Sequence, residues 1–532
     1  MITDRPRVTS PRLLAGLLSG LVSMTLIATA CSSGSTATGS GATDAATTTP
    51  SAASALRPLH AVRGTDARVS DDQGRQVLLR GVNLNGFGDY YQNNPAYPAT
   101  IPVTDDDWSE MAKQGFDVVR LLVTWSSLEP TRGTIDQGYL DTIHAAVDAA
   151  AAHGIYSVID MHQDAYSKYV GTPAGVTCPD GTEPGIGWDG APDWATLTDG
   201  ADTCATAGIR ELAPAVIRAF ENFYADTDGI QTELTKTWAA VATEFAGVDS
   251  VAGYDLFNEP NWGADSKTGG ARLGAFTQRT TAAIRAAERD AGGFSHIVFF
   301  EPVVIYPVDN TTPPADTVSD PNMVFAPHNY AESIDRGSID DKFATVSATA
   351  QQYGTTFWIG EYGWWDATAE NAAKAVRYAA AEDRYRVGGT WWQWKQACGD
   401  PHSVGATNGT PANEIIQYTR NGCPGDVDRG VIDAWKPAMT RAYPRSAPGT
   451  ITKLSSDPAT GGFTMTATRG DAAAADVSAE PLDLWFPDRG HGAPAVTGTG
   501  IGPVDVRTVA GGYRVTAPVT APGDYSVTYA PA

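Results

Sequence analysis

The stretch Val251–Trp262, VAGYDLFNEPNW, decides how the rest of the chain is interpreted. Its first seven residues have the β-branched and aromatic content of a buried strand. Asn258 and Glu259 follow at the carboxyl end, where Pro260 cannot donate a ladder hydrogen bond. In a (β/α)8 barrel the chemistry lies at the carboxyl ends of the strands. The stretch therefore predicts such a barrel, with Glu259 at its reactive end.

A second carboxylate at a strand end lies in Thr356–Trp365, TFWIGEYGWW, where Glu361 closes an apolar run. Two carboxylates on two strand ends are the equipment of a glycosidase, because one protonates the leaving oxygen while the other attacks the sugar or activates water. Each glutamate could instead cap a strand or pair with an arginine. A separation of ~5–5.5 Å between the two groups would mean retention of configuration, and ~6.5–9.5 Å would mean inversion.

Apolar strand-like segments alternate with helical patterns over most of the chain, which indicates a parallel sheet. Eight such strands predict a closed barrel, the TIM barrel. The predicted strands are residues 74–83, 117–123, 155–161, 251–257, 296–300, 322–326, 357–360 and 389–394. The predicted helices are residues 105–114, 139–153, 231–245, 271–290, 341–353 and 367–385.

Two long loops depart from the minimal barrel, one at residues 164–230 and one at 396–431. Loops of this length are usually functional at a catalytic face, so both could wall a substrate groove. The first contains an amphipathic helical pattern at 212–224.

The catalytic domain is predicted at residues 56–445, with a linker-like stretch at 444–449. Residues 446–532 carry short alternating strands between Gly and Pro turns, which predicts a small C-terminal β-sandwich domain. Its sequence holds no acid pair or metal cluster, so we expect it to pack on the barrel. Contact with a carbohydrate or lipid surface is the weaker alternative.

Residues 1–30 have a basic start, an apolar segment and the small-x-small ending Ala28-Thr29-Ala30, which predicts an export signal. Cys31 follows at once, and the tether at 31–55 is otherwise almost wholly Ser, Thr, Gly and Ala. This resembles a bacterial lipoprotein signal. It predicts an extracellular protein that is attached to the outer face of the cell membrane only through a lipid on Cys31. An ordinary secretory signal, and hence a secreted protein, is the alternative.

Four cysteines remain: Cys178, Cys204, Cys398 and Cys423. An even number in an exported chain predicts disulfides, and of three connectivities we favour the local pairs Cys178–Cys204 and Cys398–Cys423. A zinc site is disfavoured because no CxxC pair is present. The net charge of −24 argues against a nucleic-acid partner. Neither a nucleotide loop nor a metal-ligand motif occurs, so no cofactor is expected.

Polar residues near the predicted strand ends form a candidate ring. Glu259 is expected to be the general acid, with a pKa raised by its surroundings. Glu361 is expected to be the nucleophile, kept ionised by Arg120 and Tyr330. Glu301 ends the fifth strand without a preceding Asn, so we expect it to support the others. The ring comprises Arg120, His162, Asp164, Asn258, Glu259, His328, Tyr330, Glu361 and Trp394.

The other members of the ring have expected roles toward a sugar. Asn258 can hydrogen-bond the 2-hydroxyl, a contact that strengthens in the oxocarbenium-like transition state. His162 and Asp164 can hold other hydroxyls, and Trp394 offers a flat face for ring stacking. His328 can sit beside the acid and help it to act as a base.

These motifs resemble the retaining glycoside hydrolases of family 5. The matching motifs are RGVNL, VVRLLVTW, DMHQD, LFNEP, PHNY, GEYG and WWQW, along residues 59–443. Within the family, DMHQDAYS, GAPDWAT, FFEP, WWQWK and the trailing sandwich resemble the endoglycoceramidase-related group. The resemblance implies Glu259 as acid/base and Glu361 as nucleophile in a covalent glycosyl-enzyme mechanism.

The resemblance also implies a substrate, a β-linked sugar on a lipid such as ceramide. Trp188, Trp194 and the helix at 212–224 are then expected to line an apolar channel for the lipid. Two alternatives stay open. A β-glucanase or β-glucosidase would use the same carboxylates on soluble β-glucosides, and a substrate panel separates it. A binding module without catalysis would have lost a carboxylate, and both are present.

Overall fold

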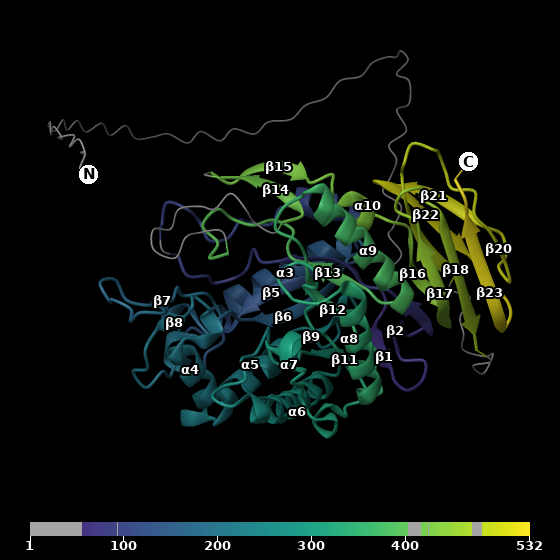
Figure 1. Ribbon diagram of the computed structural model, residues 1–532. Helices are drawn as coiled ribbons and strands as arrows, with labels where there is room; N and C mark the ends of the chain where they lie inside the picture. Colours follow the sequence, from purple (N-terminus) through teal and green to yellow (C-terminus); the bar gives the residue numbers. More distant parts are fainter. Residues whose placement is uncertain (1–55, 93, 403–416, 424, 471–480, 532) are drawn as a thin grey trace, which may run out of the picture. The chain divides into compact units, whose positions relative to one another are not determined.

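The computed structural model describes residues 56–531 except 93, 403–416, 424 and 471–480. The predicted signal, tether and lipidation site at Cys31 therefore lie outside the described residues. Figure 1 shows a core of parallel strands with helices packed around it. No helix in the part of the chain that is described combines the length and apolarity needed to cross a bilayer.

Eight parallel strands form one sheet in the order β11-β10-β9-β6-β5-β4-β13-β12. Their bounds are β4 Arg80–Leu84, β5 Val118–Thr124, β6 Tyr156–His162, β9 Val251–Asp255, β10 Ile297–Phe300, β11 Met323–Phe325, β12 Ile359–Tyr362 and β13 Gly389–Trp391. The helices between them are α1 Asp105–Lys113, α2 Trp125–Leu128, α3 Gln137–Ala152, α5 Ile230–Glu244, α6 Ser266–Asp290, α7 Tyr306–Asp309, α8 Ile339–Tyr353 and α9 Ala369–Tyr385.

The edge strands β11 and β12 lie next to each other and close the sheet into a barrel. Phe325 bridges to Phe357, and the Trp358 N–H donates to the Phe325 carbonyl at 2.9 Å. Gly253 has no side chain because a Cβ there would lie 2.1 Å from the Ile297 carbonyl of the next strand. The predicted barrel is confirmed, and each predicted strand and helix overlaps an observed one.

The two long loops carry small elements of their own. The loop after β6 forms the hairpin β7 Thr182–Pro184 and β8 Cys204–Thr206, followed by α4 Pro214–Tyr224. The loop after β13 contains the hairpin β14 Thr419–Gly422 and β15 Val427–Val431 and ends at α10 Lys436–Met439. The predicted disulfides Cys178–Cys204 and Cys398–Cys423 are both confirmed.

The C-terminal region is a sandwich of two antiparallel sheets, as predicted. One has the order β17-β18-β23-β20 and the other β1-β2-β3-β16-β19-β22-β21. Their bounds are β1 Leu59–Val62, β2 Arg68–Asp71, β3 Arg75–Val77, β16 Tyr443–Pro448, β17 Thr450–Ser456, β18 Phe463–Arg469, β19 Leu482–Pro487, β20 Thr497–Thr499, β21 Asp505–Val509, β22 Gly512–Ala517 and β23 Gly523–Tyr529.

The prediction of a linker at residues 444–449 is wrong. These residues form most of β16, which pairs with β19 on one side and with β3 on the other. The predicted boundary between 445 and 446 therefore falls within a strand. Strands β1–β3, assigned to the catalytic domain from their position in the sequence, extend a sheet of the sandwich. Pairing with strands from the other end of the chain leaves no signal in local composition.

A buried ionic cluster joins the barrel helix α9 to the sandwich. Asp383 accepts hydrogen bonds from Arg80 Nη2 at 2.8 Å and from Arg441 Nε at 3.2 Å. Its second oxygen accepts the Ser456 N–H at 2.8 Å. Because all three charged side chains are buried, removal of the carboxylate leaves two guanidinium groups with less compensation.

We therefore expect Asp383→Asn to lower the free energy of unfolding by about 3 kcal/mol. Asp505→Asn is the matched control because its partner Arg507 is exposed, and we expect it to cost less than about 1 kcal/mol. Urea denaturation of the two variants beside the native protein measures both values. Equal effects would contradict a structural role for the cluster.

Candidate active site

Glu259 and Glu361 come together at the carboxyl ends of β9 and β12. One carboxylate oxygen of Glu259, one of Glu361 and a ring nitrogen of His328 all lie within 4.8 Å of one another. Oxygens this close fit the short carboxyl spacing of a retaining glycosidase better than the wide spacing of an inverting one. The spacing agrees with the double displacement of a retaining glycosidase.

Arg120 organises the acidic groups around this pair. It lies within β5, not at its end as the sequence suggested, and it is fully buried. Its Nη1 donates to Glu361 Oε1 at 2.7 Å, and its Nη2 donates to Asn258 Oδ1 at 2.9 Å. Its other close carboxylates are Asp160, Asp255 and Glu301, at 2.9, 2.9 and 3.0 Å. One guanidinium thus fixes Glu361 and Asn258 relative to the barrel.

The backbone of Glu259 is held in an unusual conformation. Its φ of 37° lies in the left-handed region, which costs a non-glycine residue about 1 kcal/mol or more. The Glu259 N–H donates to Glu301 Oε2 at 2.9 Å, and Gln163 Nε2 donates to the Glu259 carbonyl at 3.0 Å. Glu301 therefore occupies the supporting position expected for it, because it holds the peptide that aims the Glu259 side chain.

His328 lies between the two candidate catalytic groups. Its Nδ1 is 2.8 Å from Glu259 Oε1 and 3.4 Å from Glu361 Oε2, and its Nε2 is 3.2 Å from Glu301 Oε1. The imidazole fits because residue 360 is glycine, where a Cβ would approach the ring to 3.0 Å. Tyr330 donates its hydroxyl hydrogen to Glu361 Oε2 at 2.9 Å.

The expected direction of the Glu259 pKa is wrong, whereas Arg120 and Tyr330 both bond the Glu361 carboxylate as expected. Burial would raise the pKa of Glu259, but the His328 hydrogen bond and the charges of His328 and Arg210 outweigh it and hold that pKa below its ordinary value. Burial raises the pKa of Glu361 above its ordinary value, although the charges of His328 and Arg120 oppose the shift. His328 lies beside the acid as the sequence predicted, but spacing along the chain carries no information about Arg210 reaching the same carboxylate.

The pKa of His328 is shifted in the opposite direction from that of Glu259. Burial would lower its pKa, but the charges of Glu301 and Glu361 and the hydrogen bond to Glu259 raise it well above its ordinary value. The imidazole is therefore protonated at neutral pH. A proton is thus held one hydrogen bond away from Glu259.

His162 and Asp164 lie beside the pair, as predicted, within a larger buried polar group. His162 Nδ1 is 2.8 Å from Asp160, and its Nε2 has no hydrogen-bond partner in the described part of the chain. Asp164 pairs with Arg210 at 2.7 Å and with His402 at 3.1 Å. Arg210 comes from the loop after β6 and His402 from the loop after β13. No sequence motif singled out either residue.

Trp394 does not lie with the other predicted site residues. It is 1% exposed, stacks on Tyr418 and donates its indole N–H to Asp107 at 3.0 Å. The prediction that it stacks on a sugar is therefore wrong. Trp392 lies nearer the candidate site, with its ring parallel to that of His162 at 5.4 Å, and is 3% exposed. Because β13 already ends at Trp391, the alternation of a strand does not extend to Trp394.

A cavity of about 310 Å³ opens beside Glu259. Glu259, Glu301, His328 and Tyr330 form its reactive end. One wall is apolar, and Arg210 and Asp335 lie on the polar side. The apolar lining consists of Pro302, Val303, Val304, Tyr306 and Ile334 from the loops after β10 and β11.

The expected channel residues lie elsewhere. Trp194 packs edge-on against Trp125 at 5.2 Å and donates to the Glu129 carbonyl. The apolar face of α4 is buried, with Phe223 lying 5.2 Å from the Phe257 ring. That prediction is wrong for Trp194, whereas Val216 and Phe220 of α4 line a small hollow that also borders Glu259. Trp188 is near the site but lies under the Arg210 guanidinium at 4.4 Å, outside the apolar wall.

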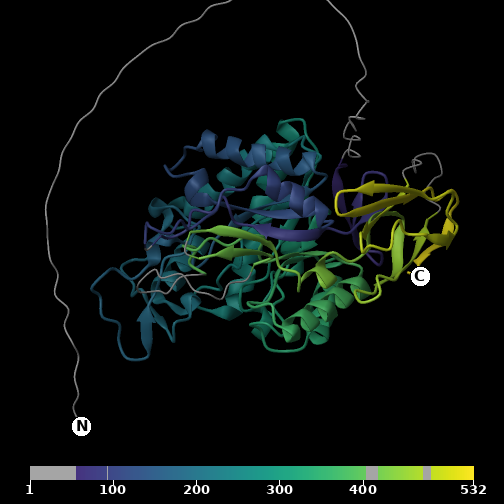
Figure 2. The same cartoon turned by 90° about the horizontal axis from the view of Figure 1, so that it is seen from above.

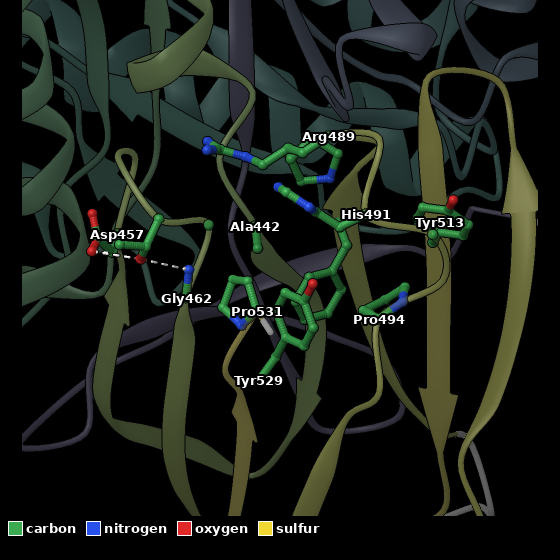
Figure 3. A pocket seen from close by; sticks show the side chains of 14 residues that line it. Ala442, Asp457, Gly462, Arg489, His491, Pro494, Tyr513, Tyr529 and Pro531 are labelled. Atoms are coloured by element: carbon green, nitrogen blue, oxygen red, sulfur yellow. Dashed lines mark hydrogen bonds between the residues drawn. The ribbon is translucent and has the colours of Figure 1, made fainter.

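A second hollow lies in the sandwich, where Figure 3 shows His491, Tyr513 and Tyr529 around it. Its volume is only about 20 Å³, too small for a sugar ring. It has no pair of facing carboxylates, since Asp457 is its one acidic lining residue. Among the residues that the structure describes, this hollow therefore lacks the carboxylate pair found in the barrel.

Residues 70–398 match the family model described as Cellulase (glycosyl hydrolase family 5), which spans more than half of the 532 residues. The chain belongs to glycosyl hydrolase family 5. The family was therefore predicted correctly from the sequence motifs.

Comparison with known relatives assigns the chain to a narrower group within family 5. Endoglycoceramidase I of Rhodococcus hoagii (strain 103S) is 28% identical over 294 residues, which are 51% of this chain and 53% of that protein. The chain thus spans about half the length of that curated relative. A solved endogalactoceramidase is 41% identical with a TM-score of 0.81, covering 89% of this chain and 100% of that one. The lactosyl-enzyme intermediate of endo-glycoceramidase II from Rhodococcus sp. is 27% identical with a TM-score of 0.66, covering 87% and 99%. The predicted endoglycoceramidase-related group is confirmed.

Two groups of side chains in the described ranges have a spacing that a metal ion could use, namely His162 with Asp164 and Asp189, and Glu259 with His328 and Glu361. Burial would lower the pKa of His162, but the charges of Asp160 and Asp189 raise it to about 9. A protonated imidazole cannot donate a lone pair to a metal. The pKa of His328 is raised as well, so a metal at either group would have to displace a proton from the imidazole.

The raised pKa of His162 gives a pH dependence of stability. A histidine whose folded pKa exceeds the unfolded value of 6.5 stabilises the fold fully below that value and loses the contribution as the pH rises through about 9. We expect the free energy of unfolding of the native protein, relative to His162→Gln, to fall by about 3 kcal/mol over that interval. Denaturant unfolding at several pH values measures the difference, with the exposed His491→Gln as control. A difference that is constant with pH would contradict the assignment.

Proposed function

We propose that the protein is a retaining β-glycosidase that hydrolyses the bond between a sugar and a lipid alcohol in glycosphingolipids or related glycolipids. The observation that carries this proposal is the closely spaced carboxylate pair, of which Glu259 lines a cavity with apolar residues on one part of its lining. Similarity to endoglycoceramidases supports it.

In the first step, Glu361 attacks the anomeric carbon while Glu259 protonates the glycosidic oxygen, and the lipid alcohol leaves. In the second step, Glu259 takes a proton from water, which attacks the same carbon and frees Glu361. Arg120 and Tyr330 hold the two Glu361 oxygens in place for attack. Asn258 is fixed by Arg120 and by its own bond to the Gln163 carbonyl, so its amide can meet the 2-hydroxyl.

The proton required in the first step is stored in the hydrogen-bonded pair of His328 and Glu259. In the free protein it resides on His328, because the pKa of Glu259 is lowered and that of His328 is raised. The 3.4 Å contact from Arg210 to Glu259 is the longer of the two cationic contacts to the acid. A leaving group in the cavity displaces the Arg210 side chain before His328. Loss of this positive charge raises the proton affinity of Glu259.

The lipid side of the bond is assigned to the cavity. Val303, Val304 and Ile334 give it an apolar surface for hydrocarbon, and Arg210 and Asp335 can meet the polar groups next to the scissile bond. The sugar side is assigned to the polar group around His162, Asp164 and Trp392. A family 5 β-glucanase or β-glucosidase acting on soluble β-glucosides is the alternative that this division of the site disfavours.

The test uses the protein carrying Cys31→Ser, with Glu361→Gln as the blank. It is offered a ganglioside, a glucosylceramide, a cello-oligosaccharide and an aryl β-glucoside, and products are identified by mass. We expect an intact oligosaccharide and ceramide from the ganglioside. We expect Glu259→Gln to lower kcat by about 10²–10⁴-fold. Cleavage of the soluble glycans alone would overturn the lipid assignment while leaving the two carboxylates in place.

A variant of the apolar wall serves as a matched control in the same assay. Val304 is half-buried and lines the cavity, so Val304→Asn changes polarity with little change in volume. We expect a higher KM for the lipid glycoside. The KM for the aryl glucoside should stay unchanged, because this substrate lacks the long hydrocarbon chains of a lipid.

We also propose that the protein is a lipoprotein held at the outer face of the cell membrane through Cys31. The apolar segment, the small residues before Cys31 and the Ser/Thr-rich stretch after it support this proposal. We expect Cys31→Ser to move the protein from the membrane fraction to the medium, measured by fractionation of the expressing cells. Retention of the variant on membranes would contradict it.

A further inference from the structure

His402 links the two long loops through one carboxylate of the active site. Its Nε2 lies 3.1 Å from Asp164 Oδ2, and Arg210 Nη2 reaches the other oxygen of Asp164 at 2.7 Å. Because Arg210 follows β6 and His402 follows β13, Asp164 is bonded by one cation from each loop. Figures 1 and 2 show the hairpins of these loops, β7–β8 and β14–β15, away from strands β20–β23 of the sandwich.

The other nitrogen of His402 is anchored to the barrel. Its Nδ1 lies 2.6 Å from Asp400 Oδ1, which also accepts the His402 backbone N–H at 2.8 Å. Asp400 is fully buried, and its second oxygen accepts the side-chain N–H of Asn85 at 2.8 Å. Asn85 directly follows β4, so the imidazole is tied to a strand end and not to a surface group.

The imidazole of His402 donates from both nitrogens. Burial would lower the pKa of His402, but the charge of Asp400 and the hydrogen bonds to Asp164 and Asp400 raise it to about 10. At neutral pH the ring therefore offers one N–H to each carboxylate. Burial would raise the pKa of Asp164, but the charge of Arg210 and the His402 hydrogen bond hold it below its ordinary value. Asp164 is thus an ionised acceptor.

Buried polar atoms around Asp164 lack partners. Among the residues that the structure describes, His162 Nε2, Trp188 Nε1 and both carboxylate oxygens of Asp189 make no hydrogen bond. His162 Nε2 lies 3.9 Å from Asp164 Oδ2, a spacing that one hydroxyl group can bridge by accepting from the imidazole and donating to the carboxylate. Because buried polar atoms are normally paired, these atoms mark where the hydroxyl groups of a ligand bind.

The two cations on Asp164 are not equivalent in the proposed reaction. Arg210 also contacts Glu259 and lines the cavity, where a leaving group displaces it. His402 is not among the described residues that line this cavity, and its bond to Asp400 is independent of it. After Arg210 has moved, His402 is therefore the cation that still bonds Asp164.

We propose that His402 is a positioning residue for sugar binding, which holds Asp164 in place to accept a hydroxyl group of the sugar next to the scissile bond. This inference rests on the glycosidase activity of the proposed function. It assigns a role to the loop after β13, because a residue of that loop then takes part in selecting the sugar.

The test compares kcat/KM for substrates that each lack one hydroxyl group, using the protein with Cys31→Ser as the parent. The full substrate is the one that the parent cleaves fastest among an aryl β-glucoside, an aryl β-lactoside, glucosylceramide and a ganglioside. Its deoxy forms lack one hydroxyl group on the sugar next to the scissile bond. We expect His402→Ala to lower kcat/KM for the full substrate by at least about tenfold, mostly through KM, since it removes a hydrogen bond between charged groups.

The deoxy forms identify the cause of that loss. In the parent, removal of the hydroxyl group that Asp164 accepts should cost about tenfold in kcat/KM. In His402→Ala the same removal should cost less than about threefold, because the two changes disrupt one interaction. Removal of the 2-hydroxyl, which is assigned to Asn258, should cost the parent and the variant equally.

Ratios between substrates on one enzyme preparation do not depend on its folded fraction, so lost stability cannot imitate this result. His402→Gln keeps a side-chain N–H for Asp164 and should recover part of the lost kcat/KM. His153→Gln is the matched control and should behave like the parent, because His153 pairs with Asp105 just before β6, at the opposite end of that strand from Asp164. Equal costs of every missing hydroxyl group in the parent and in His402→Ala would overturn the inference. A parent that cleaves none of the four full substrates would instead overturn the proposed function.

Discussion

The buried guanidinium of Arg120 is the constraint on which the active end of the barrel depends. A positive charge without solvent exposure must be compensated by nearby carboxylates, and here Asp160, Asp255, Glu301 and Glu361 surround it. Because the fork has a fixed planar geometry, it sets where these groups sit relative to one another. Glu301 in turn accepts a hydrogen bond from the Glu259 N–H and so fixes the strained Glu259 peptide. Arg120 thus positions Glu361 through one hydrogen bond and Glu259 through two.

The cationic side chains around Glu259 favour protonation states of the two glutamates that differ from those that the proposed reaction needs. His328 and Arg210 favour the ionised form of Glu259, while burial disfavours the ionised form of Glu361. Arg210 comes from the long loop after β6, so the protonation of the acid depends on a segment outside the barrel.

The sequence was sufficient for the parts of the structure that follow a repeating pattern. The eight strands, their order in the barrel class and the positions of Glu259 and Glu361 follow from apolar runs that end in polar residues. The errors have a common physical cause, which is contact between segments far apart in the chain. Trp394 turns toward Asp107, the apolar lining of the cavity comes from the loops after β10 and β11, and His328 reverses the expected pKa of Glu259. The loop after Glu301, PVVIY, was apolar enough to have been noticed.

The shared sheet has a consequence for how the chain is made. Strand β3 near the start pairs with β16, and Gln76 accepts the Ile451 N–H across 375 positions. During synthesis the first strands emerge long before their partner, so their edge waits unpaired while the whole barrel is translated. The late strands then close a sheet that the early strands began. A ribosome that stops short of β16 releases a chain with an open edge, which proteases and chaperones can distinguish from the finished protein.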